Sequence, residues 1–297
     1  MTPLVRETLE RLAASKARPE QYVVFIDFAR LATPTDVEEL NRHDLPDTFG
    51  RQFEILYDRV ERAYPGHRGF QLVPLHSSAF LYSAPTTGRK NLVIAFCGKG
   101  QSLMMPVALF LQFFSEQDFD VVVLRDFPPS GFTEGIADFG ESVRSVLSRL
   151  DRTIGFARYR SVRTVGTSGG GVASLAAGLI LDAASACCVS GHLPSTSSRY
   201  AGSAGAIALE EVLTTTQSEC RLHCVFGAKN PVDKREAEAI SKIRPVTLVP
   251  IDGCHDHTVL FYLFENGRLT SFLDQVRLTK LTNAVGGDPE MAWRGKD

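Results

Sequence analysis

The opening stretch of the chain places its apolar residues at helical spacing. The pattern predicts an amphipathic helix over residues 3–17, because one face of a helix recurs every three to four residues. That face carries Leu4, Thr8, Leu9 and Leu12. Residues 22–28 form a short apolar run whose pattern suits either a strand or the apolar end of a helix.

Two further helices are expected in the same part of the chain. Thr35 is followed three residues later by a glutamate, a capping-box pattern that marks a helix start. Residues 53–60 carry another helical pattern, and the Pro-Gly pair at 65–66 ends it. Residues 1–66 are therefore expected to form a mainly helical extension, in which no catalytic motif stands out.

From about residue 67 the pattern changes to strand-like apolar runs that soon alternate with helical ones. The predicted strands cover residues 71–75, 79–83, 91–96, 120–124, 163–165, 186–190, 222–226 and 245–250. The predicted helices cover residues 106–114, 139–150, 172–183, 206–216 and 234–240, with a final helix after residue 257. Such alternation is typical of a parallel sheet covered by helices on both faces. We therefore expect the α/β class, with a core over 67–282 and a tail over 283–297.

Composition and charge exclude several classes of protein. Apolar residues make up 44% of the chain and charged residues 22%, which is ordinary for a globular enzyme. The formal charge of −2, with lysine and arginine scattered among acids, gives no basic face for nucleic acid. No apolar run is long enough to span a bilayer, and the first ten residues lack a signal core. These features lead us to expect a cytoplasmic protein with no membrane span.

The cysteines do not indicate a metal site. Most of the six lie within apolar, strand-like runs, where a thiol behaves as a small hydrophobic group. Cys220 and Cys224 flank His223, but no second cysteine pair accompanies them at zinc-ligand spacing. We expect a buried strand at this position and no bound metal.

The segment Gly166-Thr-Ser-Gly-Gly170 matches the pattern G-x-S-x-G. This pattern places a serine on a sharp turn from a strand to a helix, where side chains two residues away would clash. An apolar strand precedes Ser168 and a helix rich in alanine and leucine follows it. A phosphate-binding turn is the alternative, but such a turn usually follows the first strand of its domain and needs an acid about twenty residues later. The pattern therefore favours Ser168 as a nucleophile.

The order of these features resembles that of the α/β-hydrolase superfamily over residues 67–273. In that family an acid follows a later strand and a histidine follows the last strand. The resemblance implies that Asp233 is the acid and that His257 or His255 is the general base. His257 is preferred because it directly precedes the final predicted helix.

The acid is the less certain member of this set. The usual Gly-x-x-Asp spacing, counted from Gly227, falls on Asn230 and not on an aspartate. An asparagine could orient the histidine but would stabilise its charged form poorly. Asp233 is therefore preferred, although an aspartate there could also be a helix N-cap. Asp252 and Asp256, close to the histidines, are weaker alternatives.

The resemblance also implies an oxyanion hole made of two backbone amides. Gly169, directly after the serine, would supply one. Lys99, between two glycines after the strand 91–96, would supply the other. No cofactor is implied.

We therefore expect a serine hydrolase that cleaves an ester, thioester or related acyl bond through an acyl-enzyme. The partner would be a small molecule or another acyl substrate. An acyltransferase on the same scaffold, or a non-catalytic hydrolase-like protein that binds a partner, are the alternatives. The site should be bordered by the Ser/Gly-rich loop 190–205, Met104 and Met105, and the N-terminal helices, and His192 could line it.

Overall fold

The structure is a computed structural model that describes residues 1–63, 66–197 and 200–279. Within these residues eight strands form one sheet, in the order β1-β2-β4-β3-β5-β6-β7-β8. The strands are β1 (Gln71–His76), β2 (Ala79–Ser83), β3 (Asn91–Phe96), β4 (Phe119–Leu124), β5 (Val162–Thr167), β6 (Ser185–Val189), β7 (Arg221–Gly227) and β8 (Thr247–Ile251). Strand β2 pairs antiparallel with β1 and β4, and all the other pairs are parallel. The predicted mainly parallel sheet is confirmed, and every predicted strand overlaps an observed one.

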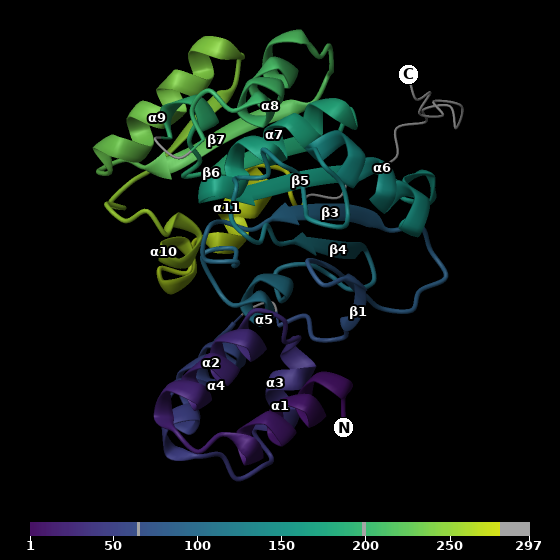
Figure 1. Cartoon of the computed structure of the whole chain (residues 1–297), viewed down its shortest axis with the longest axis vertical. Helices are drawn as coiled ribbons and strands as arrows, with labels where there is room; N and C mark the ends of the chain where they lie inside the picture. Colours follow the sequence, from purple (N-terminus) through teal and green to yellow (C-terminus); the bar gives the residue numbers. More distant parts are fainter. Residues whose placement is uncertain (64–65, 198–199, 280–297) are drawn as a thin grey trace.

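Helices cover both faces of this sheet (Figure 1). The helices are α1 (Pro3–Ala14), α2 (Arg18–Ala29), α3 (Pro34–Leu40), α4 (Asp47–Arg62), α5 (Val107–Leu111), α6 (Val143–Ile154), α7 (Gly171–Ile180), α8 (Ala204–Thr215), α9 (Pro231–Ile243), α10 (Val259–Glu265) and α11 (Leu269–Gln275). Buried residues of α6 to α9 pack on one face, and those of α1 to α5, α10 and α11 pack on the other. The predicted tail, 283–297, and the end of the predicted core, 280–282, lie outside the described residues.

The central strands are buried on both sides. In β3, Val93 and Ala95 belong to the core beneath the N-terminal helices, whereas Leu92, Ile94 and Phe96 belong to the opposite core. Successive side chains of a strand point to opposite faces, so a strand with helices on both faces must be apolar throughout. This is why the sequence shows continuous apolar runs there and not an alternating pattern.

The four N-terminal helices pack around a group of aromatic rings. Residues 22–28, which fitted either a strand or a helix, lie in helix α2. Phe28 of α2 contacts Phe49 and Phe53 of α4, with ring centroids 6.5 Å and 6.1 Å away. These buried rings belong to the same apolar core as Val93 of the sheet. The helical segment is thus packed onto the sheet through a continuous core (Figure 1).

Two predicted helix starts were wrong. Helix α3 is capped by Thr33 and not by Thr35, because Thr33 accepts from the Asp36 amide at 3.1 Å and Asp36 accepts from the Thr33 amide at 2.8 Å. Pro34 then occupies the first helical position, where its missing N–H costs nothing. Helix α6 begins at Val143 and not near residue 139, because Gly140 is still paired with Ile136 in an isolated β-bridge.

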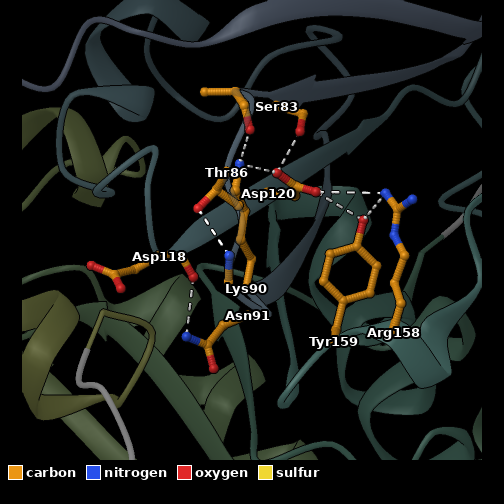
Figure 2. Close-up of polar contacts among 10 residues, drawn as sticks. Ser83, Thr86, Lys90, Asn91, Asp118, Asp120, Arg158 and Tyr159 are labelled. Carbon is orange, nitrogen blue, oxygen red and sulfur yellow. Dashed lines mark hydrogen bonds and ion pairs between the residues drawn. The ribbon is translucent and has the colours of Figure 1, made fainter.

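A buried ion pair lies near the amino-terminal ends of β3 and β4 (Figure 2). Lys90 Nζ is 2.9 Å from Asp120 Oδ1, and both side chains are 4% exposed. The Ser83 hydroxyl donates to Asp120 at 2.6 Å and the Tyr159 hydroxyl donates at 3.0 Å. Lys90 also donates to the Ala84 carbonyl. Both charges are therefore compensated, as burial requires.

Across the described ranges, no helix is both long and apolar enough to cross a membrane.

Candidate active site

Ser168 lies on the turn that joins β5 to α7. A short 3-10 helix, Ser168–Gly170, separates the strand from the helix. Ser168 has a φ of 50°, a left-handed conformation that non-glycine residues rarely adopt. Such a conformation costs roughly 1–3 kcal/mol and persists only where the surrounding structure imposes it. Here it presents the hydroxyl at the end of a parallel strand, next to the start of α7.

Glycines on both sides of Ser168 make this turn possible. A Cβ at Gly166 would lie 2.0 Å from the Gly170 carbonyl oxygen, and a Cβ at Gly170 would lie 2.5 Å from the Phe96 carbonyl oxygen. Gly171 is equally restricted, since its Cβ would lie 2.7 Å from Cys188 Sγ. The pattern read from the sequence thus has its steric explanation in the turn itself and in the neighbouring strand β3, and β6 restricts the glycine that follows.

His257 lies on the loop between β8 and α10 and reaches Ser168. Its Nε2 is 2.9 Å from Ser168 Oγ, and its Nδ1 is 2.9 Å from Asp233 Oδ1. Because a carboxylate only accepts hydrogen bonds, Nδ1 carries the hydrogen and Nε2 accepts from the Ser168 hydroxyl. His255 lies elsewhere: its ring is 71% exposed and 3.6 Å from the carboxylate of Asp256. Of the two histidines, His257 is the one that contacts Ser168.

Asp233 lies in the first turn of α9, and its side chain is 6% exposed. Asn230 is the N-cap of this helix, and its side-chain oxygen accepts from the Asp233 amide at 3.1 Å. The Asn230 side-chain amide also donates to Asp233 Oδ2 at 3.1 Å. The two residues considered for the acid position therefore act together: Asn230 caps the helix and holds the carboxylate that contacts His257. Neither Asp252 nor Asp256 hydrogen-bonds His257 within the described residues.

The charge of Asp233 acts directly on the histidine. The hydrogen bond to Asp233 raises the pKa of His257 above its ordinary value, against the opposing effect of burial. The imidazole is therefore a stronger base than a free histidine, and the carboxylate stabilises the charged form that results when it takes a proton.

The loop after β3 approaches the serine from the other side. A Cβ at Gly98 would lie 3.1 Å from Ser168 Cβ, a tight contact, so a glycine favours this close approach. The Lys99 amide nitrogen is 4.0 Å from the position that a Cβ on Gly169 would occupy. No acceptor within the described residues is hydrogen-bonded to the Lys99 amide. Lys99 and Gly169 thus lie close together beside Ser168 and line the same cavity.

The strand order places Ser168 and its two partners at the same end of the sheet. Ser168 follows β5, Asp233 follows β7 and His257 follows β8, all at the carboxyl edge of one mainly parallel sheet with an antiparallel β2. The chain has the α/β-hydrolase fold. In a hydrolase fold the carboxyl ends of the strands gather side chains from distant parts of the sequence, as ligand sites in open α/β sheets do.

Comparisons with known proteins give no match in sequence and only distant matches in structure. No family model matches the chain, and no curated protein matches it in sequence. Among solved structures it is similar to Est1E from Butyrivibrio proteoclasticus, with 14% identity, a TM-score of 0.49 and coverage of 71% of this chain and 100% of that one. It is also similar to the enterochelin esterase from Shigella flexneri, with 18% identity, a TM-score of 0.46 and coverage of 70% and 59%. At identities this low, the likeness says nothing about function, and the residues of the site are the evidence for it.

A cavity of about 300 Å³ opens beside Ser168. One part of the wall consists of Gly98, Lys99 and Gly169, and a second part contains residues that the sequence had not singled out. These are Asp126, Pro129, Gly131 and Tyr200. The position of the first three, directly after β4 at the carboxyl edge, was the signal that could have found them.

Asp126 holds the shape of this second part of the wall. Its carboxylate accepts from the Ser130 amide at 2.6 Å and the Phe132 amide at 2.9 Å. Burial raises the pKa of Asp126, and these N–H donors oppose the shift. The Tyr200 hydroxyl donates to the Pro129 carbonyl at 2.6 Å and joins the loop 190–205 to the same wall.

His192, from the loop after β6, lines the same cavity. Burial lowers the pKa of His192, so this ring stays neutral over a wider pH range than a free histidine. Met104 and Met105, also expected near the site, line a different groove beside α2 and α4.

Proposed function

We propose that the protein is a serine hydrolase that cleaves an ester, thioester or related acyl bond. The single observation that carries the proposal is the continuous hydrogen-bond chain Ser168–His257–Asp233, in which each link is about 3 Å long. A nucleophile, a base within hydrogen-bond reach and a group that orients the base are the requirements of acyl transfer through a covalent intermediate. The strained position of Ser168 supports the same role.

The first half of the reaction forms an acyl-enzyme. Ser168 Oγ attacks the substrate's carbonyl carbon while its proton passes to His257 Nε2, and the carbonyl π electrons move to the oxygen. The Lys99 and Gly169 amides donate to that oxyanion. The carbon–oxygen or carbon–sulfur bond then breaks, and the leaving atom takes the proton from His257. Asp233 stabilises the imidazolium that exists between these two proton transfers.

The second half releases the acid and restores the serine. Water gives a proton to His257 and attacks the acyl carbon, and the bond to Ser168 Oγ then breaks as the proton returns to the serine. The His257 side chain is 47% exposed, which gives water access to its Nε2 side.

The test is covalent labelling with a fluorophosphonate probe, combined with hydrolysis of p-nitrophenyl acetate. Wild-type protein should be labelled at Ser168, and Ser168→Ala should lose both labelling and turnover, the latter by about 10⁴-fold or more. Ser148→Ala is the matched control, because Ser148 lies on the surface of α6 and donates only to a carbonyl of its own helix.

Three results distinguish the alternatives. Labelling with release of free acid supports the hydrolase. Labelling with product formed mainly on an added alcohol or amine supports the acyltransferase. A folded wild type that is neither labelled nor active would overturn the proposal and leave the non-catalytic, partner-binding alternative.

A further inference from the structure

A second depression lies next to the proposed catalytic residues and belongs to no step of the mechanism. It is a groove of about 370 Å³ between the N-terminal helices and the loop after β3. Its lining is largely apolar and includes Phe25, Ile26, Ile55, Leu56, Met104 and Met105. Helices α2 and α4 form one side, close to α5 and α10 (Figure 1).

The wall from α2 and α4 is preformed. Phe25 packs edge-on against Phe49, with ring centroids 5.8 Å apart, and the rings behind it are fully buried. Ile55 remains 47% exposed on the groove side, although the same helix buries its other large apolar residues in the core. A rigid wall with an exposed branched side chain presents an apolar surface without first having to be ordered.

The groove adjoins both groups that act on the reacting bond. Gly100 and Ser102 line it, and they follow Lys99, the proposed oxyanion donor. Thr258 lines it too and directly follows His257. Arg30 of α2 donates to the Gly100 carbonyl at 3.0 Å, which ties the N-terminal helices to the oxyanion loop. A substrate held at Ser168 therefore has this groove within reach.

The two depressions differ in the polarity of their linings, and this difference indicates which part of the substrate each one binds. The cavity at Ser168 contains both proposed oxyanion donors together with Asp126, His192 and Tyr200, and its lining is more polar than that of the groove. The groove has methionine and aromatic walls and begins at the loop of His257. In acyl transfer the leaving atom must lie against His257 Nε2, because that nitrogen supplies its proton.

We propose that this groove binds an apolar leaving group, the alkyl chain of an alcohol or thiol, while a small acyl group occupies the polar cavity. The inference rests on the proposed hydrolase function and gives the N-terminal helices a role in substrate selection. Methionine side chains suit such a site, because they adapt to alkyl chains of different shape.

The test compares two ester series with the full-length protein. The first varies the alcohol, with ethyl, butyl and hexyl acetate, and the second varies the acid, with ethyl acetate, butyrate and hexanoate. We expect kcat/KM to rise by about twofold or more for each added methylene in the alcohol series, since each methylene leaves water in an open groove. The acid series should show little gain.

A tryptophan at Ile55 fills the groove from its outer wall. In Ile55→Trp the ratio of kcat/KM for hexyl acetate to that for ethyl acetate should fall at least about fivefold. Val23→Trp is the matched control, because Val23 is a similarly exposed residue of α2, at 54%, that does not line the groove. Its ratio should equal that of the wild type.

The outcomes separate this inference from the proposed function. If Ser168 is labelled but chain length has no effect, if only the acid series shows a gain, or if both tryptophan variants behave alike, the groove assignment is wrong and the hydrolase remains. If wild-type Ser168 is not labelled at all, both proposals fail together.

Discussion

Two buried aspartates each form a pair with a basic side chain, one at the amino-terminal ends of the strands and one at their carboxyl-terminal ends, and the two pairs have different roles. Asp120, at the amino edge, is paired with Lys90 and also accepts from Ser83 and Tyr159 (Figure 2). Asp233, at the carboxyl edge, is paired with a histidine that is 47% exposed. Both side chains of the first pair are 4% exposed, although they line a surface depression. The second pair connects a buried charge to an accessible base and, through it, to Ser168.

The comparison indicates that such a pair becomes reactive when the basic side chain also contacts a nucleophile on the side away from the acid. Lys90 ends at a backbone carbonyl, its second acceptor beside Asp120. His257 ends at a hydroxyl held in a strained turn. Changes at the two aspartates should therefore affect different properties: activity at Asp233 and stability at Asp120.

The largest effect is expected for Asp233→Asn. An asparagine can hold the imidazole in place, but it favours the wrong tautomer and cannot stabilise the imidazolium. We expect kcat/KM for p-nitrophenyl acetate to fall by about 10⁴-fold, with a small change in the urea midpoint. Asp256→Asn is the control, since Asp256 is exposed and pairs with His255. An activity loss as large in Asp256→Asn would contradict the assigned acid.

The next largest effect is expected for Asp120→Asn. This change leaves the Lys90 ammonium buried without its counter-charge, which should lower the free energy of unfolding by about 3–5 kcal/mol, measured by urea denaturation. Activity per folded molecule should stay near that of the wild type. The double variant Lys90→Met with Asp120→Leu removes both charges and should recover most of the stability. Equal destabilisation in the single and double variants would refute the ion-pair explanation.

A smaller effect is expected for Arg30→Met. The change removes the hydrogen bond to the Gly100 carbonyl, which holds the loop of Lys99 against α2. A loosened oxyanion loop should lower kcat/KM by about threefold to tenfold, the worth of one hydrogen bond. Arg11→Met removes an ion pair with Asp27 in the same helical segment, without touching this loop, and should keep wild-type activity.

The smallest effect is a shift in the pH profile. Neutral His257 is required as the base, and Asp233 raises the pKa of His257. Activity should therefore be lost as the pH falls through a value above that of a free histidine. In Asp233→Asn the residual activity should persist to lower pH, because the charge that raised the pKa is gone. An acid limb at the same pH in both proteins would show that another group controls it.

Much of the fold could be predicted from local pattern. The buried strands were found because helices on both faces make them apolar throughout, as in β3 and β4. The helix starts were less accurate, since Thr33 and Thr35 compete as caps and the deciding feature was Pro34. Residues 22–28 could not be assigned because their burial depends on Phe49 and Phe53, which come later in the chain.

For the site, the sequence by itself determined the turn at Ser168. A Cβ at Gly166 would clash within the turn and a Cβ at Gly170 would clash with β3, but both glycines stand within five consecutive residues, so the pattern is readable from the sequence. Sequence order could also place an acid and two histidines after the right strands, because parallel strands end at one edge.

Tertiary structure alone decided which of these residues meet. His257 lies 89 positions from Ser168 and 24 from Asp233, and a hydrogen bond over such a separation depends on β5, β6, β7 and β8 lying in that order in one sheet. The same packing brings Asp233, which Asn230 supports from within its own helix turn, to His257, and it brings the N-terminal helices to the loop of Lys99. Local pattern records steric needs within a few residues, whereas the partner of a side chain is set by the whole fold.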